Sequence, residues 1–348
     1  MNGAALKIYH LQYLCFHWAA LWARVHLRLN HRYLDNRERR MSLGRRTCRR
    51  PFVNSVCVGF VACCLLSWRL SLAKRPLVTF HKIGEHGRLG NQIFQVAATI
   101  GIAEQNNARW AFPKSIETTA VGKLFQLRGE STLNRRVAIW LKEKQETFYE
   151  VTLPEIAANE VISLHGYYQS RQYFAQSGEA LREVLKISPV LTQAVKEKVP
   201  EVNAHGSVTM HVRRGDFQSY GPLYYVLHPQ YYVAALDMIK NDINVVIVVT
   251  DDEKWCTENL LGLIPYTTII SHSEDELFDF VLLHLGKHII IANSSFSWWA
   301  AFLKGLLTNW TDVGTVVAPT PWYNRAGRLA KLNRLSFYPP SWKLLETD

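Results

Sequence analysis

The chain has 348 residues, of which 48% are apolar and 12% aromatic, enough for two ordinary domains with hydrophobic cores. Its net charge of +11 would suit a nucleic-acid-binding protein. However, residues 1–51 hold 11 Lys and Arg against 2 Asp and Glu, whereas the rest of the chain holds 29 against 27. A nucleic-acid-binding domain carries its positive charge on the folded surface, so this distribution argues against nucleic acid as a partner.

An apolar run follows the basic N-terminal segment. Residues 52–68 contain no charged side chain, and a helix of that length spans about 26 Å, the short end of a bilayer crossing. The stronger positive flank is N-terminal, which predicts that this side stays cytoplasmic. We therefore predict a basic cytoplasmic tail over 1–51 and a transmembrane signal anchor over 52–72. A buried core helix and a cleaved signal peptide are the alternatives.

The first half of the remaining chain begins with a βαβ pattern. Leu77–Ile83 predicts a strand, Ile93–Gln105 a helix of period about 3.6, and residues 108–112 the next strand. Helical patterns near 121–145 and 178–199 follow. We assign residues 77–200 to an N-terminal α/β domain.

A glycine-rich segment joins the first strand to the first helix. Its glycines at 84, 87 and 90 fit neither the dinucleotide fingerprint nor the P-loop. We expect a loop that faces a cleft with Gly90, Asn91 and Gln92. The alternative is a tight connection in which Asn91 caps the helix.

The second half alternates strands and helices more regularly. The predicted strands are 208–213, 244–252, 288–297 and 313–318, and the predicted helices are 230–240, 273–285 (with Ser273 to Glu276 as a capping box) and 298–307. Nearly continuous apolar strands in such alternation predict a parallel sheet covered on both faces. We assign residues 207–340 to a second α/β domain, connected to the first through residues 201–206.

Polar side chains gather where three of these strands end. The clusters are His211, Arg213, Arg214 and Asp216; Asp251 and Asp252; and Asn293, Ser294, Ser295 and Ser297. The carboxyl ends of parallel strands lie at one edge of a sheet, so the clusters can converge. Guanidinium groups match phosphate oxygens, and a helix N-terminus binds anions. The pattern predicts a nucleotide-diphosphate pocket; surface charges and plain helix caps are the alternative.

The sequence resembles the α-1,2-fucosyltransferases of glycosyltransferase family 11. The matching motifs are Gly90–Gln95, His211–Asp216, Thr250–Trp255 and Ser294–Trp299, in order over roughly residues 78–325. The resemblance implies a type II Golgi membrane protein with a lumenal, GT-B-like catalytic part of two facing Rossmann-like α/β domains. It also implies inverting transfer of L-fucose from GDP-β-L-fucose to the 2-hydroxyl of a galactose on a glycoprotein or glycolipid glycan.

Carried over by position, the resemblance assigns a donor site. Its expected residues are Arg213 and Arg214 on the diphosphate, Asp251 toward the nucleoside, Ser294, Ser295, Phe296 and Ser297 as the cradle, and Gly90, Asn91 and Gln92 lining the cleft from the first, acceptor-side domain. The expected partners are GDP-fucose, a galactose-terminated glycan and the Golgi membrane, and a homodimer is allowed for.

Inversion requires a base for the acceptor hydroxyl and positive charge for the departing GDP. Asp216 and His211 are the candidate bases, with Glu85 as a further choice, although Asp216 could equally brace an arginine. The two arginines, Arg213 and Arg214, are expected to supply the positive charge, so we expect neither a metal nor another cofactor.

Two sequons and two alternative functions complete the expectations. Asn309 is the predicted N-glycosylation site, whereas Asn293 falls inside the predicted pocket and should stay unmodified. One alternative function is a related glycosyltransferase with another acceptor, such as one that fucosylates a protein hydroxyl. The other is a membrane-tethered nucleotide-sugar-binding protein without activity.

Overall fold

The computed structural model describes residues 75–347, except 131–132, 134–136, 145–147, 158–159, 220–222, 274, 312, 328 and 333–336. The described residues belong to one compact unit. The predicted tail (1–51) and signal anchor (52–72) lie outside them. No helix in the described part of the chain combines the length and apolar character that a membrane crossing requires. The tail and the anchor therefore stay predictions.

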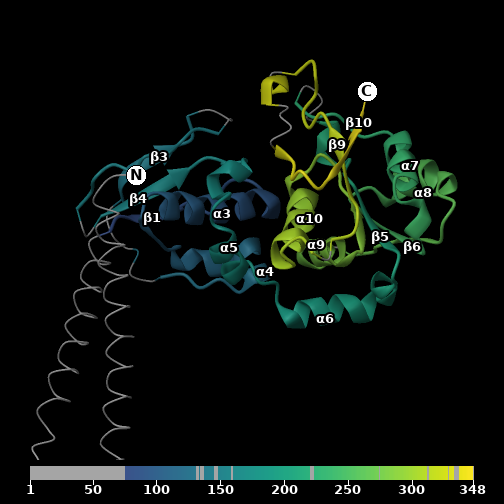
Figure 1. Ribbon diagram of the computed structural model, residues 1–348, viewed down its shortest axis with the longest axis horizontal. Coiled ribbons are helices and arrows are strands. Elements are labelled where there is room, and N and C mark those ends of the chain that lie inside the picture. Colours follow the sequence, from purple (N-terminus) through teal and green to yellow (C-terminus); the bar gives the residue numbers. More distant parts are fainter. Residues whose placement is uncertain are drawn as a thin grey trace, which may run out of the picture. The chain divides into compact units, whose positions relative to one another are not determined.

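The first sheet has four parallel strands in the order β2-β1-β4-β3 (Figure 1). The strands are β1 (Leu77–Thr79), β2 (Arg109–Trp110), β3 (Val137–Lys142) and β4 (Val161–His165). The helices in this half of the chain are α3 (Leu89–Gln105), α4 (Ala120–Phe125), α5 (Gly178–Val184) and α6 (Pro189–Lys198), of which α6 packs against a helix of the second sheet. The helical prediction over 121–145 is wrong at Val137–Lys142, because the apolar run of β3 pairs with β4 instead.

The second sheet has six parallel strands in the order β10-β9-β8-β5-β6-β7. The strands are β5 (Ser207–Val212), β6 (Val245–Thr250), β7 (Thr268–Ile270), β8 (His288–Ile290), β9 (Val316–Thr320) and β10 (Lys343–Glu346). The helices are α7 (Pro229–Asp237), α8 (Glu253–Asn259), α9 (Glu276–Leu285) and α10 (Ser295–Leu307). Short 3-10 helices include Arg171–Phe174, Asp216–Gln218 and Leu261–Leu263. The two parallel sheets fit the predicted GT-B-like α/β architecture.

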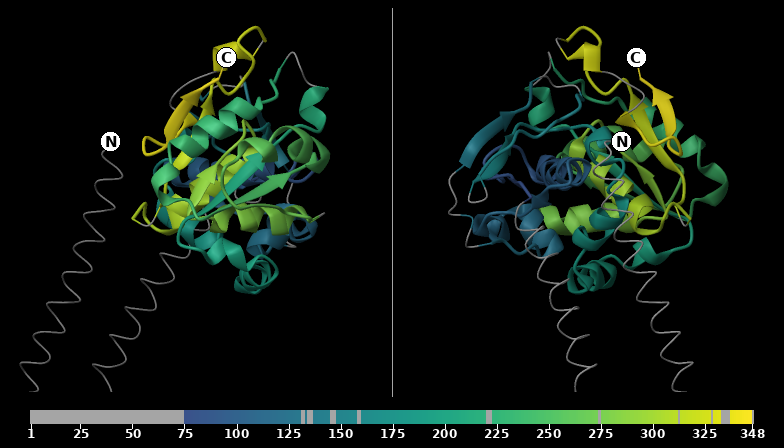
Figure 2. Two further views of the ribbon diagram at one scale, coloured as in Figure 1. Left: turned by 90° about the vertical axis from the view of Figure 1, so that its right-hand side faces the viewer. Right: turned by 60° about the vertical axis from the view of Figure 1, so that its left-hand side comes forward.

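Burial on both faces explains the unbroken apolar strands of the second sheet. In β6, Val246 and Val248 pack in the cluster that includes α7 and α8 side chains. Val245 and Ile247 point the other way, into the cluster of α9 and α10. Figures 1 and 2 show these helix pairs on opposite faces of the sheet. The prediction of a parallel sheet covered on both faces is thereby confirmed.

The helices α3 and α10 connect the two sheets. A Cβ atom built on Gly90 would lie 2.5 Å from the backbone nitrogen of Phe296, so only glycine allows this approach. Further along, the Phe94 ring centroid lies 4.9 Å from that of Trp298 and 5.0 Å from that of Trp299. All three side chains are fully buried. The two helix N-termini therefore meet at one point.

Three helices begin more than one residue away from their predicted starts. The helix α3 begins at Leu89 with Arg88 as N-cap, so Gly90 and Asn91 belong to its first turn and not to a loop or cap. The helix α9 begins at Glu276, because the Asp275 side chain, not Ser273, accepts the Leu277 N–H at 2.8 Å. Likewise, α10 begins at Ser295, three residues before the predicted start. The strands β7 and β10 and the helix α8 were not predicted.

Substitution of Gly90 by Ala should destabilise the protein. The added methyl group would force the α3 and α10 backbones apart, which costs about 1–3 kcal/mol and is only partly offset by the better helix propensity of Ala. The free energy of unfolding in urea measures this loss. Gly262→Ala is the matched control, because nothing lies within 4 Å of its added Cβ atom. Equal stability of the two variants would contradict the close packing.

Candidate active site

A cavity of about 590 Å³ lies where the strand ends of the second sheet meet the N-termini of α3 and α10. The predicted residues that line it are Gly90, Asn91, His211, Arg213, Asp216, Asp251, Ser294, Ser295 and Phe296. Arg214, Gln92 and Ser297 do not line it. The three predicted strand-end clusters thus contribute to one cavity, as the topology requires.

Two carboxylates hold Arg213 at the end of β5. Its Nη2 lies 2.6 Å from Asp216 Oδ1, and its Nη1 lies 2.8 Å from Asp251 Oδ2. The Arg213 side chain is 15% exposed. The guanidinium is therefore fixed by two opposed pairs while it still lines the cavity. Asp216 thus braces Arg213 through its Oδ1 oxygen, which is one of the two roles expected for it.

Arg214 stabilises the loop instead of lining the cavity. Its Nε lies 3.1 Å from Asp252 Oδ2, and its guanidinium lies 3.9 Å from the centre of the Trp255 ring. Its backbone N–H donates to Asp251 Oδ1 at 2.9 Å. Arg214 thereby helps to place Asp251, which in turn holds Arg213. A direct contact between Arg214 and the donor does not follow from this geometry.

The first turn of α10 forms one wall of the cavity. Ser294 is the N-cap residue, and its side chain makes no cap hydrogen bond. The first N–H groups of a helix have no partner within the helix and attract anions. Ser295 Oγ donates to Asn91 Oδ1 at 3.0 Å, which ties α10 to α3. Ser297 is buried, and its hydroxyl donates to the Ser294 carbonyl at 3.3 Å, so its role is within the helix turn.

His211 is a buried, neutral side chain. It is 5% exposed, and its ring centroid lies 5.5 Å from that of Phe296. Burial and the nearby Arg213 charge lower the pKa of His211 to about 3. A base with so low a pKa takes up a proton poorly at neutral pH. His211 Nδ1 is buried and has no hydrogen-bond partner in the described part of the chain.

The cavity also includes residues that were not predicted. Arg88 reaches it from the first sheet, and Glu276 and Asp279 reach it from α9. Burial is the main cause that raises the pKa of Asp279 to about 7, and the Ser271 hydroxyl opposes this by donating to the carboxylate at 3.4 Å. Glu276 and Asp279 are three residues apart and therefore lie on one face of α9. In the sequence alone, this face looks like any helix face that is exposed to solvent.

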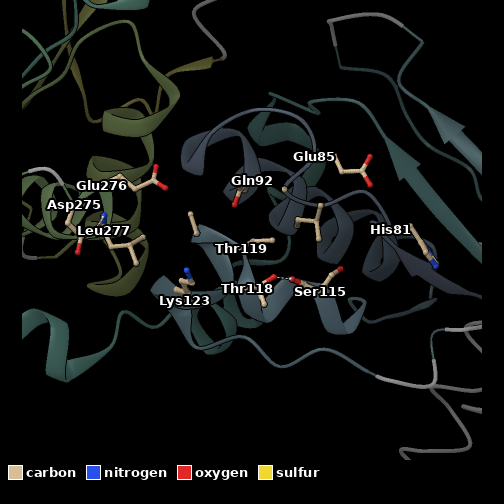
Figure 3. Close-up of a pocket in the computed structure, with 13 residues that line it drawn as sticks. His81, Glu85, Gln92, Ser115, Thr118, Thr119, Lys123, Asp275, Glu276 and Leu277 are labelled. Carbon is tan, nitrogen blue, oxygen red and sulfur yellow. Dashed lines mark hydrogen bonds between the residues drawn. The ribbon is translucent and has the colours of Figure 1, made fainter.

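A second cavity of about 620 Å³ adjoins the first at Glu276, which lines both (Figure 3). Figure 3 shows Gln92, Thr119 and Lys123 on one side and the start of α9 on the other. Gln92 lines this cavity, and its Oε1 accepts the Val121 N–H at 3.2 Å. Glu85, the third candidate base, lines the second cavity as well and not the first.

The two sequons differ in accessibility. Asn293 is 1% exposed, and its Nδ2 donates to the carbonyls of Tyr225 and Trp322 at 3.1 and 3.3 Å. Asn309 is exposed just after α10, in the left-handed region with φ of 50°. Access by a glycosylating enzyme is therefore open only at Asn309, whose modification stays a prediction.

Sequence comparison identifies the family of the chain. The model of glycosyl transferase family 11 matches residues 60–344, so the chain belongs to that family. An α-1,2-colitosyltransferase of Escherichia coli is 32% identical over 195 residues, which cover 52% of this chain and 61% of the relative. Galactoside α-(1,2)-fucosyltransferase 1 of Bos taurus is 25% identical over 256 residues, 64% of this chain and 66% of the relative. The chain thus spans less than two thirds of the length of each of these relatives.

Solved structures align with lower similarity. POFUT1 in complex with GDP aligns with a TM-score of 0.44 and 10% identity, covering 70% of this chain and 98% of that structure. The fucosyltransferase NodZ from Bradyrhizobium aligns with a TM-score of 0.45 and 12% identity, covering 66% and 93%.

The raised pKa of Asp279 should make stability depend on pH. The folded state binds a proton on the Asp279 carboxylate more tightly than the unfolded state does. Protonation of Asp279 therefore stabilises the fold at low pH, and this stabilisation is lost as the pH rises from about 4 to about 7. Asp279→Asn should therefore gain stability relative to the wild type between pH 4.5 and pH 8, measured as urea midpoints. The exposed Asp237→Asn is the control. A pH-independent difference between Asp279→Asn and wild type would show that Asp279 titrates normally.

Proposed function

We propose that this protein transfers L-fucose from GDP-β-L-fucose to the 2-hydroxyl of a galactose on a glycan, with inversion. The observation that carries the proposal is that Arg213 and the N-terminus of α10 line the same cavity. A guanidinium and a helix N-terminus together are suited to a diphosphate. Membership of glycosyl transferase family 11 and relatives named as galactoside α-(1,2)-fucosyltransferases support the sugar and the linkage.

The leaving group determines what the cavity must stabilise. As the acceptor oxygen bonds to C1 of fucose, the bond from C1 to the phosphate oxygen breaks and its electron pair departs with GDP. Arg213 and the first turn of α10 supply positive charge where this negative charge develops. In this proposal no metal ion is required for that step, because the protein's own groups provide the charge.

We assign the nucleoside to three residues that line the cavity, His211, Phe296 and Asp279, of which His211 and Phe296 have ring centroids 5.5 Å apart. Both carboxylate oxygens of Asp251 are already engaged, by Arg213 Nη1 and by the Arg214 N–H, so we assign it to positioning. A carboxylate such as that of Asp279 can accept from the N1–H and the amino group of guanine. The Phe296 ring offers a surface against which a base can stack.

Three alternatives remain as outcomes of an activity assay. The α-1,2-colitosyltransferase relative makes GDP-colitose a second donor to test. The protein-hydroxyl acceptor and the inactive nucleotide-sugar-binding protein are the other candidates.

We further propose that the chain is a single-pass type II protein of the Golgi membrane with a lumenal catalytic part. The uncharged run 52–68 after a basic segment supports this orientation.

The full-length protein in detergent should fucosylate a β-galactoside with GDP-fucose but not with GDP-mannose or UDP-galactose. An α-1,2-specific fucosidase should remove the product's fucose. Arg213→Ala should lower kcat by about 10²- to 10³-fold, because it removes a group that stabilises the leaving charge, and Arg213→Lys should lose less. Circular dichroism checks that both variants fold.

Arg128→Ala is the matched control, since Arg128 is 84% exposed and pairs with Glu117 at 3.9 Å, away from the cavity. Near wild-type turnover by a folded Arg213→Ala would refute the diphosphate assignment. Tight GDP binding without transfer to any acceptor would favour the inactive binding protein.

A further inference from the structure

Arg88 brings a second guanidinium to the cavity from the first sheet. It follows Gly84 and Gly87, whose φ angles of 87° and 78° turn the chain sharply, and it is the N-cap residue of α3. Its side chain is 72% exposed and lines the cavity. Its Nη2 lies 3.6 Å from Asp216 Oδ2, so the pair joins the two sheets across the cavity.

The charges around Arg213 show why a second cation matters. Arg213 carries one positive charge, and its two carboxylate partners, Asp216 and Asp251, carry two negative charges at 2.6 and 2.8 Å. The group as a whole is therefore negative toward an approaching diphosphate. Among the described residues that line the cavity, Arg88 is the one other Arg or Lys. Arg88 is therefore the lining residue whose positive charge can offset the net negative charge of Arg213, Asp216 and Asp251.

The two arginines differ in how firmly they are held. The Arg213 pairs are short, and its side chain is largely buried. The Arg88 pair is longer, and the exposed guanidinium can exchange this contact at little cost, because an exposed ion pair contributes about 0–1 kcal/mol. A bound diphosphate offers Arg88 several strong acceptors in place of one carboxylate oxygen.

We propose that Arg88 is a second donor-binding residue, which leaves Asp216 and binds the diphosphate when GDP-fucose enters. This inference rests on the proposed function. The exchange exposes Asp216 Oδ2, while Asp216 Oδ1 keeps its contact with Arg213. The freed oxygen then accepts the proton of the acceptor hydroxyl as the bond from C1 to the phosphate breaks. GDP departs with the electron pair, and its charge is shared between Arg88 and Arg213.

Calorimetric titration of the full-length protein with GDP tests this proposal. Arg88→Ala should weaken GDP binding by about 10- to 100-fold, the range for loss of one hydrogen bond to a charged group. Guanosine, which lacks phosphates, should bind the variant and the wild type alike. Arg88→Lys should recover part of the affinity for GDP. In activity assays, Arg88→Ala should lower kcat in addition to any rise in the KM for GDP-fucose. The exposed Arg128→Ala should match the wild type.

The outcomes separate the two proposals. If the wild type binds GDP and transfers fucose while Arg88→Ala binds GDP equally well, the role of Arg88 is wrong and the proposed function stands. If Arg88→Ala weakens guanosine and GDP to the same degree, Arg88 only shapes the loop, and the inference is also wrong. If the wild type does not bind GDP, the proposed function itself fails.

Discussion

The pairing of Arg213 with Asp216 and Asp251 is the interaction on which the site depends. It fixes a guanidinium at the carboxyl end of the second sheet, with one carboxylate from the same loop and one from the neighbouring strand end. Such a geometry holds the side chain in place before any ligand arrives, which is a general requirement of electrostatic catalysis. The same carboxylates reduce the charge that Arg213 presents, so the site needs further positive groups.

The site also requires that the two sheets keep a fixed position relative to each other, and the contact between α3 and α10 provides this. Gly90 permits a backbone contact that no larger residue allows, and Ser295 bonds to Asn91 across the same junction. Consequently, both helix N-termini open onto one cavity, and residues of both sheets line it.

The strand-end clusters of the second half could be predicted from the sequence. Buried strands such as Val245–Thr250 have an unmistakable apolar pattern, and parallel topology brings their ends to one edge. The divergence of Arg213 and Arg214 could not be predicted, because alternation along a strand no longer fixes side-chain directions once the chain turns after Val212. Nor does an isolated apolar run such as Val137–Lys142 distinguish a strand from a helix.

The misplaced helix starts have a related cause. Gly90 is a poor helix former, so local propensity argued for a loop, and the tertiary contact with α10 outweighs that propensity. The role of Asp279 as a lining residue could not be predicted for another reason. A carboxylate on an amphipathic helix is usually solvated, and only the packing of α9 beside the cavity reveals that this one is partly buried.

A crystal structure of the protein with GDP would show directly which groups bind the diphosphate. We expect the diphosphate in the cavity of Arg213, with phosphate oxygens within hydrogen-bond distance of the Arg213 guanidinium and of the first N–H groups of α10. GDP bound in the neighbouring cavity of Gln92 and Lys123, or with its phosphates directed away from Arg213, would contradict this expectation.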